Sequence, residues 1–144
     1  MAKKSATIDL SDSFEKIPVK IFPGIKQGSG AVARQIADLI IEKQKKKEKC
    51  VLGLATGSTP KTLYAELVRL HREEKLSFKN VVAFNLDEYY PIDNDALQSY
   101  NRFMRVNLFD HVDINPKNIH IPNGEIKKDD IKAHCQQYEK LIAD

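Results

Sequence analysis

The chain has 144 residues, 42% hydrophobic and 30% charged, which are ordinary values for one globular domain with a sizeable core. Its net charge of +3 is too small to indicate a nucleic-acid partner, and the densest basic run, 43–49, contains an acid and no aromatic residue. No apolar run approaches the roughly 20 residues that span a bilayer, and no apolar stretch follows the basic start, so we expect neither a membrane partner nor a signal peptide.

The first half of the chain predicts a polar arm followed by a strand and a helix. Residues 1–16 are polar and weakly patterned, which is typical of a tail or peripheral arm. Residues 17–22 alternate enough to predict a short strand, ending at a Pro-Gly pair. From about residue 31 the apolar positions follow the period of a helix. Its predicted apolar face consists of Val32, Ile36, Leu39 and Ile40.

Two short apolar runs predict strands that are buried on both faces, at residues 50–55 (CVLGLA) and 81–86 (VVAFNL). A helical stripe at residues 63–75 separates them. Further helices are expected at residues 99–110 and 129–143.

A brief strand is expected between those last two helices, at residues 119–121. Strands that alternate with helices predict a doubly wound α/β fold: a mostly parallel sheet with helices on both faces. We expect residues 17–144 to form part of a single domain of this class.

Hydroxyl groups follow the first of these buried strands, at Thr56, Ser58 and Thr59. Gly57 lets the backbone turn and approach a ligand closely, and we expect Thr59 to cap the next helix with Pro60 at its first position. Free N–H groups at a helix start bind anions, so the turn is a candidate phosphate site as well as an ordinary capped turn. It lacks the P-loop and dinucleotide-binding patterns.

An acidic pair, Asp87 and Glu88, follows the second buried strand, whose last inward-facing residue we expect to be Leu86. Neighbouring acids raise each other's proton affinity, which suits a general base, although an acid at a strand end can also serve as a simple cap. Ligands of open α/β sheets bind beyond the carboxyl ends of the strands, so we expect the turn and the acids to face one crevice.

The remaining polar residues form no convincing site. His111 and Asp113 are an HxD pair without a third ligand, so we expect no metal. The two cysteines, Cys50 and Cys135, form no CxxC pair. Free thiols of this kind are typical of a reducing cytoplasm, where we expect the protein to lie.

Four stretches together resemble one family. Residues 51–60 (VLGLATGSTP) resemble the phosphate-loop segment of glucosamine-6-phosphate deaminases, and residues 84–90 (FNLDEYY) resemble the FN-x-DEY pattern of that family. Residues 99–104 (SYNRFM) and 107–113 (NLFDHVD) are similar to it as well. The resemblance runs from about residue 17 to the end and implies a Rossmann-like fold of the sugar-phosphate isomerase type.

The resemblance implies an enzyme of amino-sugar breakdown that converts glucosamine 6-phosphate and water to fructose 6-phosphate and ammonia, by aldose–ketose isomerisation with deamination. It implies Asp87 as the general base, with Glu88 in support. Thr56, Gly57, Ser58 and Thr59 carry over as the contacts to a phosphorylated amino sugar. No metal or organic cofactor is implied.

The resemblance covers the amino-terminal half of that family only. Its members continue with a glycine-rich segment that holds an acid and a histidine for ring opening, and then a glutamate. We therefore expect this chain to be inactive alone. Missing strands would expose a sheet edge and apolar surface, so we also expect it to self-associate, for example as a homo-oligomer.

Two other families are considered. A 6-phosphogluconolactonase shares the implied fold and loop, but an arginine usually follows its acid pair, where this chain has Tyr89. A non-catalytic effector domain that binds sugar phosphates would fit a helix-turn-helix segment, which residues 1–30 lack, and retention of Asp87 favours an enzyme.

Overall fold

The structure is a computed structural model that describes residues 17–143, so the arm expected at residues 1–16 lies outside the described residues. The elements are α1 (Ile25–Lys45), β1 (Cys50–Leu54), α2 (Lys61–Glu74), β2 (Val81–Asn85), α3 (Tyr100–Asn107), β3 (Ile119–His120) and α4 (Ile131–Ala143).

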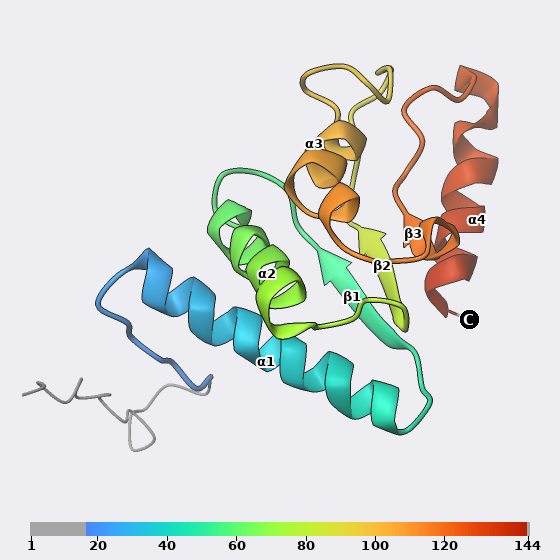
Figure 1. Ribbon diagram of the computed structural model, residues 1–144. Coiled ribbons are helices and arrows are strands. Elements are labelled where there is room, and N and C mark those ends of the chain that lie inside the picture. The colour runs from blue at the N-terminus through green and yellow to red at the C-terminus, as the bar shows by residue number, and fades with distance from the viewer. Residues whose placement is uncertain (1–16, 144) are drawn as a thin grey trace, which may run out of the picture.

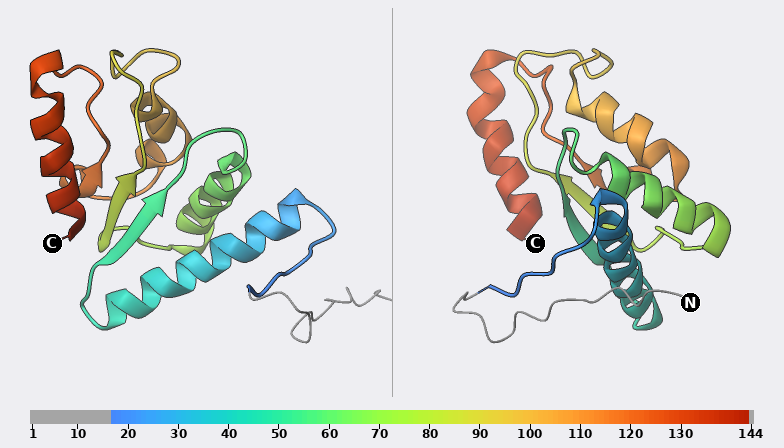
Figure 2. Two further views of the ribbon diagram at one scale, coloured as in Figure 1. Left: turned by 180° about the vertical axis from the view of Figure 1, so that it is seen from behind. Right: turned by 90° about the vertical axis from the view of Figure 1, so that its left-hand side faces the viewer.

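The three strands form one parallel sheet in the order β1-β2-β3. α1, α2 and α3 lie on one side of this sheet and α4 lies on the other (Figure 1), as the right-hand view of Figure 2 shows most clearly. The predicted α/β class, with parallel strands and helices on both faces, is confirmed. No helix within residues 17–143 combines the length and apolarity needed to cross a membrane.

The core lies between the sheet and the helices of the first side, where α1 contributes Ala33, Ala37 and Ile40 as its buried residues. The predicted face of this helix was partly wrong, because Val32 and Leu39 are 42% and 41% exposed. The two alanines let α1 pack closely against α2, so the small residues rather than the larger neighbours face inward. The helix also begins earlier than expected, at Ile25.

The strand predicted at residues 17–22 is wrong. This segment forms no strand, and its apolar side chains are exposed, with Ile17 at 73% and Ile21 at 59%. A strand needs a neighbour to pair its backbone groups, and the sheet of the described residues contains β1, β2 and β3 only. Alternation alone therefore did not make this segment a strand.

β1 was expected to be buried on both faces and is buried on one. Cys50 and Leu54 are buried on the core side, whereas Val51 is 61% exposed on the other. α4 covers this second face over β2, where the ring of Tyr138 lies edge-on to Phe84 with centroids 5.9 Å apart. The part over β1 stays open.

The open part of this face forms an apolar hollow of about 390 Å³ beside α4. Leu86 and Ile142 line it together with Val51, and they are 76% and 54% exposed. The side of the sheet that carries α4 is thus incompletely covered.

Candidate functional site

The candidate site begins where β1 and β2 end side by side. The two strands pair in parallel, and the register matches Leu54 with Asn85. The hydroxyl-rich turn therefore leaves the sheet next to the segment that carries the acids. This edge, the carboxyl rim of the sheet, is where open α/β sheets bind ligands.

The turn after β1 has the backbone that a glycine permits. Gly57 has φ +99°, a left-handed conformation in which other residues are strained. Thr56 is half-buried, and Gly57, Ser58 and Thr59 are exposed. Thr59 is not the helix cap that we expected, because α2 begins at Lys61 and Pro60 occupies the cap position.

β2 ends one residue earlier than expected, at Asn85, and Leu86 does not face inward. Asn85 takes that place: it is 1% exposed, and its side-chain amide donates to the carbonyl of Leu54 at 2.9 Å. This bond ties the two strand ends together. From the other face, the hydroxyl of Tyr138 lies 2.7 Å from the carbonyl oxygen of Asn85 and 2.9 Å from that of His120.

The two acids that follow have different surroundings. Asp87 is exposed, whereas Glu88 is half-buried and its carboxylate accepts hydrogen bonds from the start of α3. One oxygen accepts the backbone N–H groups of Tyr89 and Tyr100, and the other accepts the hydroxyl of Ser99 and the N–H of Asn101, all at 2.9 Å. Glu88 thus holds α3 against the rim and leaves Asp87 as the acid that is open to a ligand.

Tyr100 is a member of this site that the sequence reasoning missed. The pKa of its phenol is raised, mainly by a hydrogen bond with Tyr89 and by partial burial. The charges of Tyr89 and Asp87 raise this pKa further, whereas a hydrogen bond with Thr56 lowers it. The pKa of this phenol therefore responds both to the turn, through Thr56, and to the carboxylate of Asp87. Its position in the family-like stretch 99–104 was the available signal.

His111 and Asp113 serve the structure. Both oxygens of Asp113 accept hydrogen bonds from the loop between α2 and β2, from the hydroxyl of Ser77 at 2.8 Å and the N–H of Phe78 at 2.5 Å. Burial alone would raise the pKa of Asp113, but these bonds and the nearby His71 lower it overall. Nε2 of His111 lies 2.8 Å from the carbonyl oxygen of Val106.

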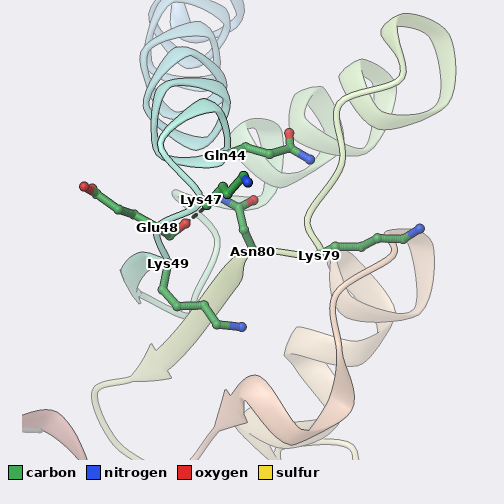
Figure 3. A pocket seen from close by; sticks show the side chains of 6 residues that line it. All are labelled: Gln44, Lys47, Glu48, Lys49, Lys79 and Asn80. Atoms are coloured by element: carbon green, nitrogen blue, oxygen red, sulfur yellow. Dashed lines mark hydrogen bonds between the residues drawn. The ribbon is translucent and has the colours of Figure 1, made fainter.

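A lysine-rich hollow of about 280 Å³ lies at the amino ends of the strands, away from the carboxyl rim (Figure 3). The amide of Asn80 donates there to the carbonyl oxygens of Ile40 and Glu48, at 3.2 and 3.3 Å. Its lining residues are Gln44, Lys47, Glu48, Lys49, Lys79 and Asn80. Because sheet ligands bind at the opposite rim, this hollow is not the candidate site.

Known proteins share both the sequence and the fold. Residues 26–144 match the family model described as glucosamine-6-phosphate isomerases/6-phosphogluconolactonase. A glucosamine-6-phosphate deaminase of Treponema denticola is 52% identical over 111 residues, which are 76% of this chain and 40% of that protein.

Two solved structures extend the comparison. A monomeric glucosamine-6-phosphate deaminase superimposes with a TM-score of 0.76 at 42% identity, over 83% of this chain and 47% of that one. A 6-phosphogluconolactonase of Thermotoga maritima gives 0.65 at 26% identity, over 80% and 49%. The chain spans less than half the length of the curated relatives that it matches. It belongs to the family of glucosamine-6-phosphate isomerases and 6-phosphogluconolactonases.

Proposed function

We propose that this chain provides the phosphate-binding loop and the proton-transfer base of a glucosamine-6-phosphate deaminase. The whole enzyme would convert glucosamine 6-phosphate and water to fructose 6-phosphate and ammonia. The observation that carries the proposal is the pairing of Leu54 with Asn85. Because these two residues are neighbours at the ends of β1 and β2, the turn 56–59 and the segment with Asp87 leave the sheet at the same rim. Membership of the family supports it.

The turn 56–59 is suited to hold the phosphate. Its exposed hydroxyls and the first N–H groups of α2 are donors for an anion, and a glycine at φ +99° brings the backbone close. An anchored phosphate fixes the distance between the sugar and the neighbouring acid, which converts an encounter into an oriented reaction.

Asp87 then acts as the general base on the open-chain sugar. It takes the proton from C2 and returns it at C1, while the nitrogen gives up one proton and the C1 oxygen gains one, so that the amino aldehyde becomes the imine of a ketose. Water hydrolyses the carbon–nitrogen double bond, so that ammonia leaves and the ketone remains. Glu88 supports this step indirectly, because it fixes the segment that carries Asp87 to α3.

Because the chain spans less than half the length of its relatives, we propose that it binds the sugar phosphate without turning it over. Calorimetric titration with glucosamine 6-phosphate tests the binding, and an ammonia assay tests the turnover. Replacing Ser58 and Thr59 together by alanine should weaken binding about a hundredfold or more, since each of the two lost hydrogen bonds to a charged group contributes about 1.5–3 kcal/mol. Thr62→Ala, on the first turn of α2, is the matched control and should bind like the wild type.

Two results would contradict the proposal: binding that the loop variant leaves unchanged, or ammonia release by the chain alone at the rate of a full-length deaminase. A lactonase is the second candidate, which the Thermotoga maritima structure supports. Titration with 6-phosphogluconate separates the two, because a lactonase should bind this acid more tightly than it binds glucosamine 6-phosphate. Tyr89, where lactonases usually carry an arginine, favours the deaminase.

A further inference from the structure

Two loops that are far apart in the sequence meet at Gly124. Residues 86–92 follow β2 and carry Asp87, and residues 121–125 follow β3. The backbone N–H of Ile92 donates to the carbonyl oxygen of Gly124 at 3.0 Å, and Gly124 is buried. The segment that carries the acid therefore has a second neighbour besides α3.

The contact leaves no room for a side chain at Gly124. A Cβ atom there would overlap Cγ2 of Ile92 and would lie 2.7 Å from the carbonyl oxygen of Tyr89 and 2.8 Å from that of Ile92. The φ angle of Gly124 lies outside the left-handed region, so the space and not the backbone conformation requires glycine. None of the other glycines has a backbone atom so close to the place of its missing Cβ.

Hydrogen bonds hold residues 121–125 from two sides. The N–H of Asn123 donates to Nε2 of His134 on α4 at 3.0 Å, and the N–H of Glu125 donates to Oδ1 of Asn123 at 2.9 Å. The carboxylate of Glu125 accepts a hydrogen bond from the side-chain amide of Asn94, just beyond the acid segment. This loop is therefore tied both to α4 and to the chain that follows Asp87.

Asp87 is exposed, so the position of its carboxylate depends on the backbone that carries it. Glu88 ties this backbone to α3, and Gly124 packs on it from Tyr89 to Ile92. The position of a reacting group matters greatly, because a misplacement of about 1 Å can cost about a hundredfold in rate.

We propose that Gly124 is a positioning residue for Asp87. Because it has no side chain, residues 121–125 pack directly on the backbone of residues 89–92 and thereby set the place of the carboxylate relative to the turn 56–59. This inference rests on the proposed function and deepens it. Gly124 acts through Asp87 and not through a contact to the substrate.

The test titrates the chain with two probes by calorimetry. Inorganic phosphate requires the turn 56–59 alone, whereas glucosamine 6-phosphate also places C2 and its amino group at Asp87. Gly124→Ala should weaken binding of the sugar phosphate about tenfold or more, the loss of one hydrogen bond to a charged group, and should leave phosphate binding within about twofold. Combined with Asp87→Asn, the same substitution should cost no more than about twofold, because the group that it displaces is already altered. Gly30→Ala is the matched control, since a Cβ there meets nothing within 4 Å.

A second variant covers the case in which Gly124→Ala does not fold. His134→Ala removes the acceptor of the Asn123 N–H and adds no atoms. It should weaken binding of the sugar phosphate about two- to tenfold, the effect of one neutral hydrogen bond, and leave phosphate binding unchanged. Cys135→Ala, at the exposed neighbouring position of α4, should bind both probes like the wild type. If circular dichroism shows that Gly124→Ala is unfolded, His134→Ala decides.

The outcomes separate the two claims. If the wild type binds glucosamine 6-phosphate no more tightly than inorganic phosphate, or if Asp87→Asn binds it as tightly as the wild type, the proposed function fails and this inference fails with it. If Asp87→Asn loses the preference and the folded Gly124→Ala keeps it, only the role of Gly124 is overturned. Equal losses for both probes, or a full loss in the Asp87→Asn background, would indicate a general disturbance of the fold and would also overturn the inference.

Discussion

Glu88→Gln should destabilise the fold although the side chain keeps its size. The carboxylate accepts four hydrogen bonds, two at each oxygen. An amide keeps one accepting oxygen and places an NH₂ group against the remaining donors. Of those donors, the hydroxyl of Ser99 can rotate and accept, but the backbone N–H of Asn101 cannot.

The expected loss follows from this geometry. One hydrogen bond to a charged group contributes about 1.5–3 kcal/mol, and a negative charge at a helix start adds about 0.3–1 kcal/mol. We therefore expect Glu88→Gln to lower the free energy of unfolding by about 2–4 kcal/mol. Urea unfolding followed by far-UV circular dichroism at neutral pH measures it. Faster hydrogen exchange at the amides of Tyr100 and Asn101 would locate the effect.

Asp87→Asn is the matched control, because it makes the same chemical change at the neighbouring position. Asp87 is exposed, so its replacement should alter the free energy of unfolding by no more than about 0.5 kcal/mol. Equal losses for the two variants, or no loss for Glu88→Gln, would refute the reasoning that Glu88 organises α3.

Three further predictions concern stability and assembly. The pKa of Asp113 is lowered below its ordinary value of 3.8, so its contribution to stability is present above that pH and lost as the pH falls; Asp113→Asn should be less stable than the wild type at neutral pH, with a difference in urea unfolding that shrinks in acid. Burial raises the pKa of Tyr64 from 10.0 to about 12, so its contribution is full below pH 10 and lost above it. Tyr64→Phe, which lacks the hydrogen bond to the carbonyl of Ala55, should lose about 1 kcal/mol at neutral pH and show a weaker decline in alkali. No strand within residues 17–143 pairs with the outer edge of β1, and Val51 and Leu86 are exposed, so we expect self-association, which Val51→Lys should reduce in sedimentation runs; a wild type that stays monomeric at high concentration would contradict this.

The sequence predicted the alternation of strands and helices well, because runs such as CVLGLA and VVAFNL carry their own signal. β3 was also found, as Ile119–His120. The wrong predictions concern segments whose structure depends on tertiary contacts. Residues 17–22 have the alternation of a strand but no partner, and Val51 lies on a face that the described residues leave open. Neither fact can be read from the segment itself.

The candidate site divides in the same way. Asp87 and the turn 56–59 could be proposed because polar residues directly after buried strands share a rim. The hydrogen bonds of Glu88 and the position of Tyr100 could not be predicted, because both depend on how α3 returns to the rim after a long loop. Likewise, Leu86 was expected inward because it is apolar, but Asn85 is the buried residue there, since its amide finds the carbonyl of Leu54.

The hydroxyl of Tyr138 has a single proton shared between two strand ends, the carbonyls of Asn85 and His120. α4 is thereby hydrogen-bonded to the last residue of β2, which is only two positions before Asp87. A displacement of this outer helix, by a binding partner or by further polypeptide packing beside it, would reach the carboxyl rim of the sheet through this phenol. The helix that looks most peripheral in the fold is therefore coupled to the segment that carries Asp87.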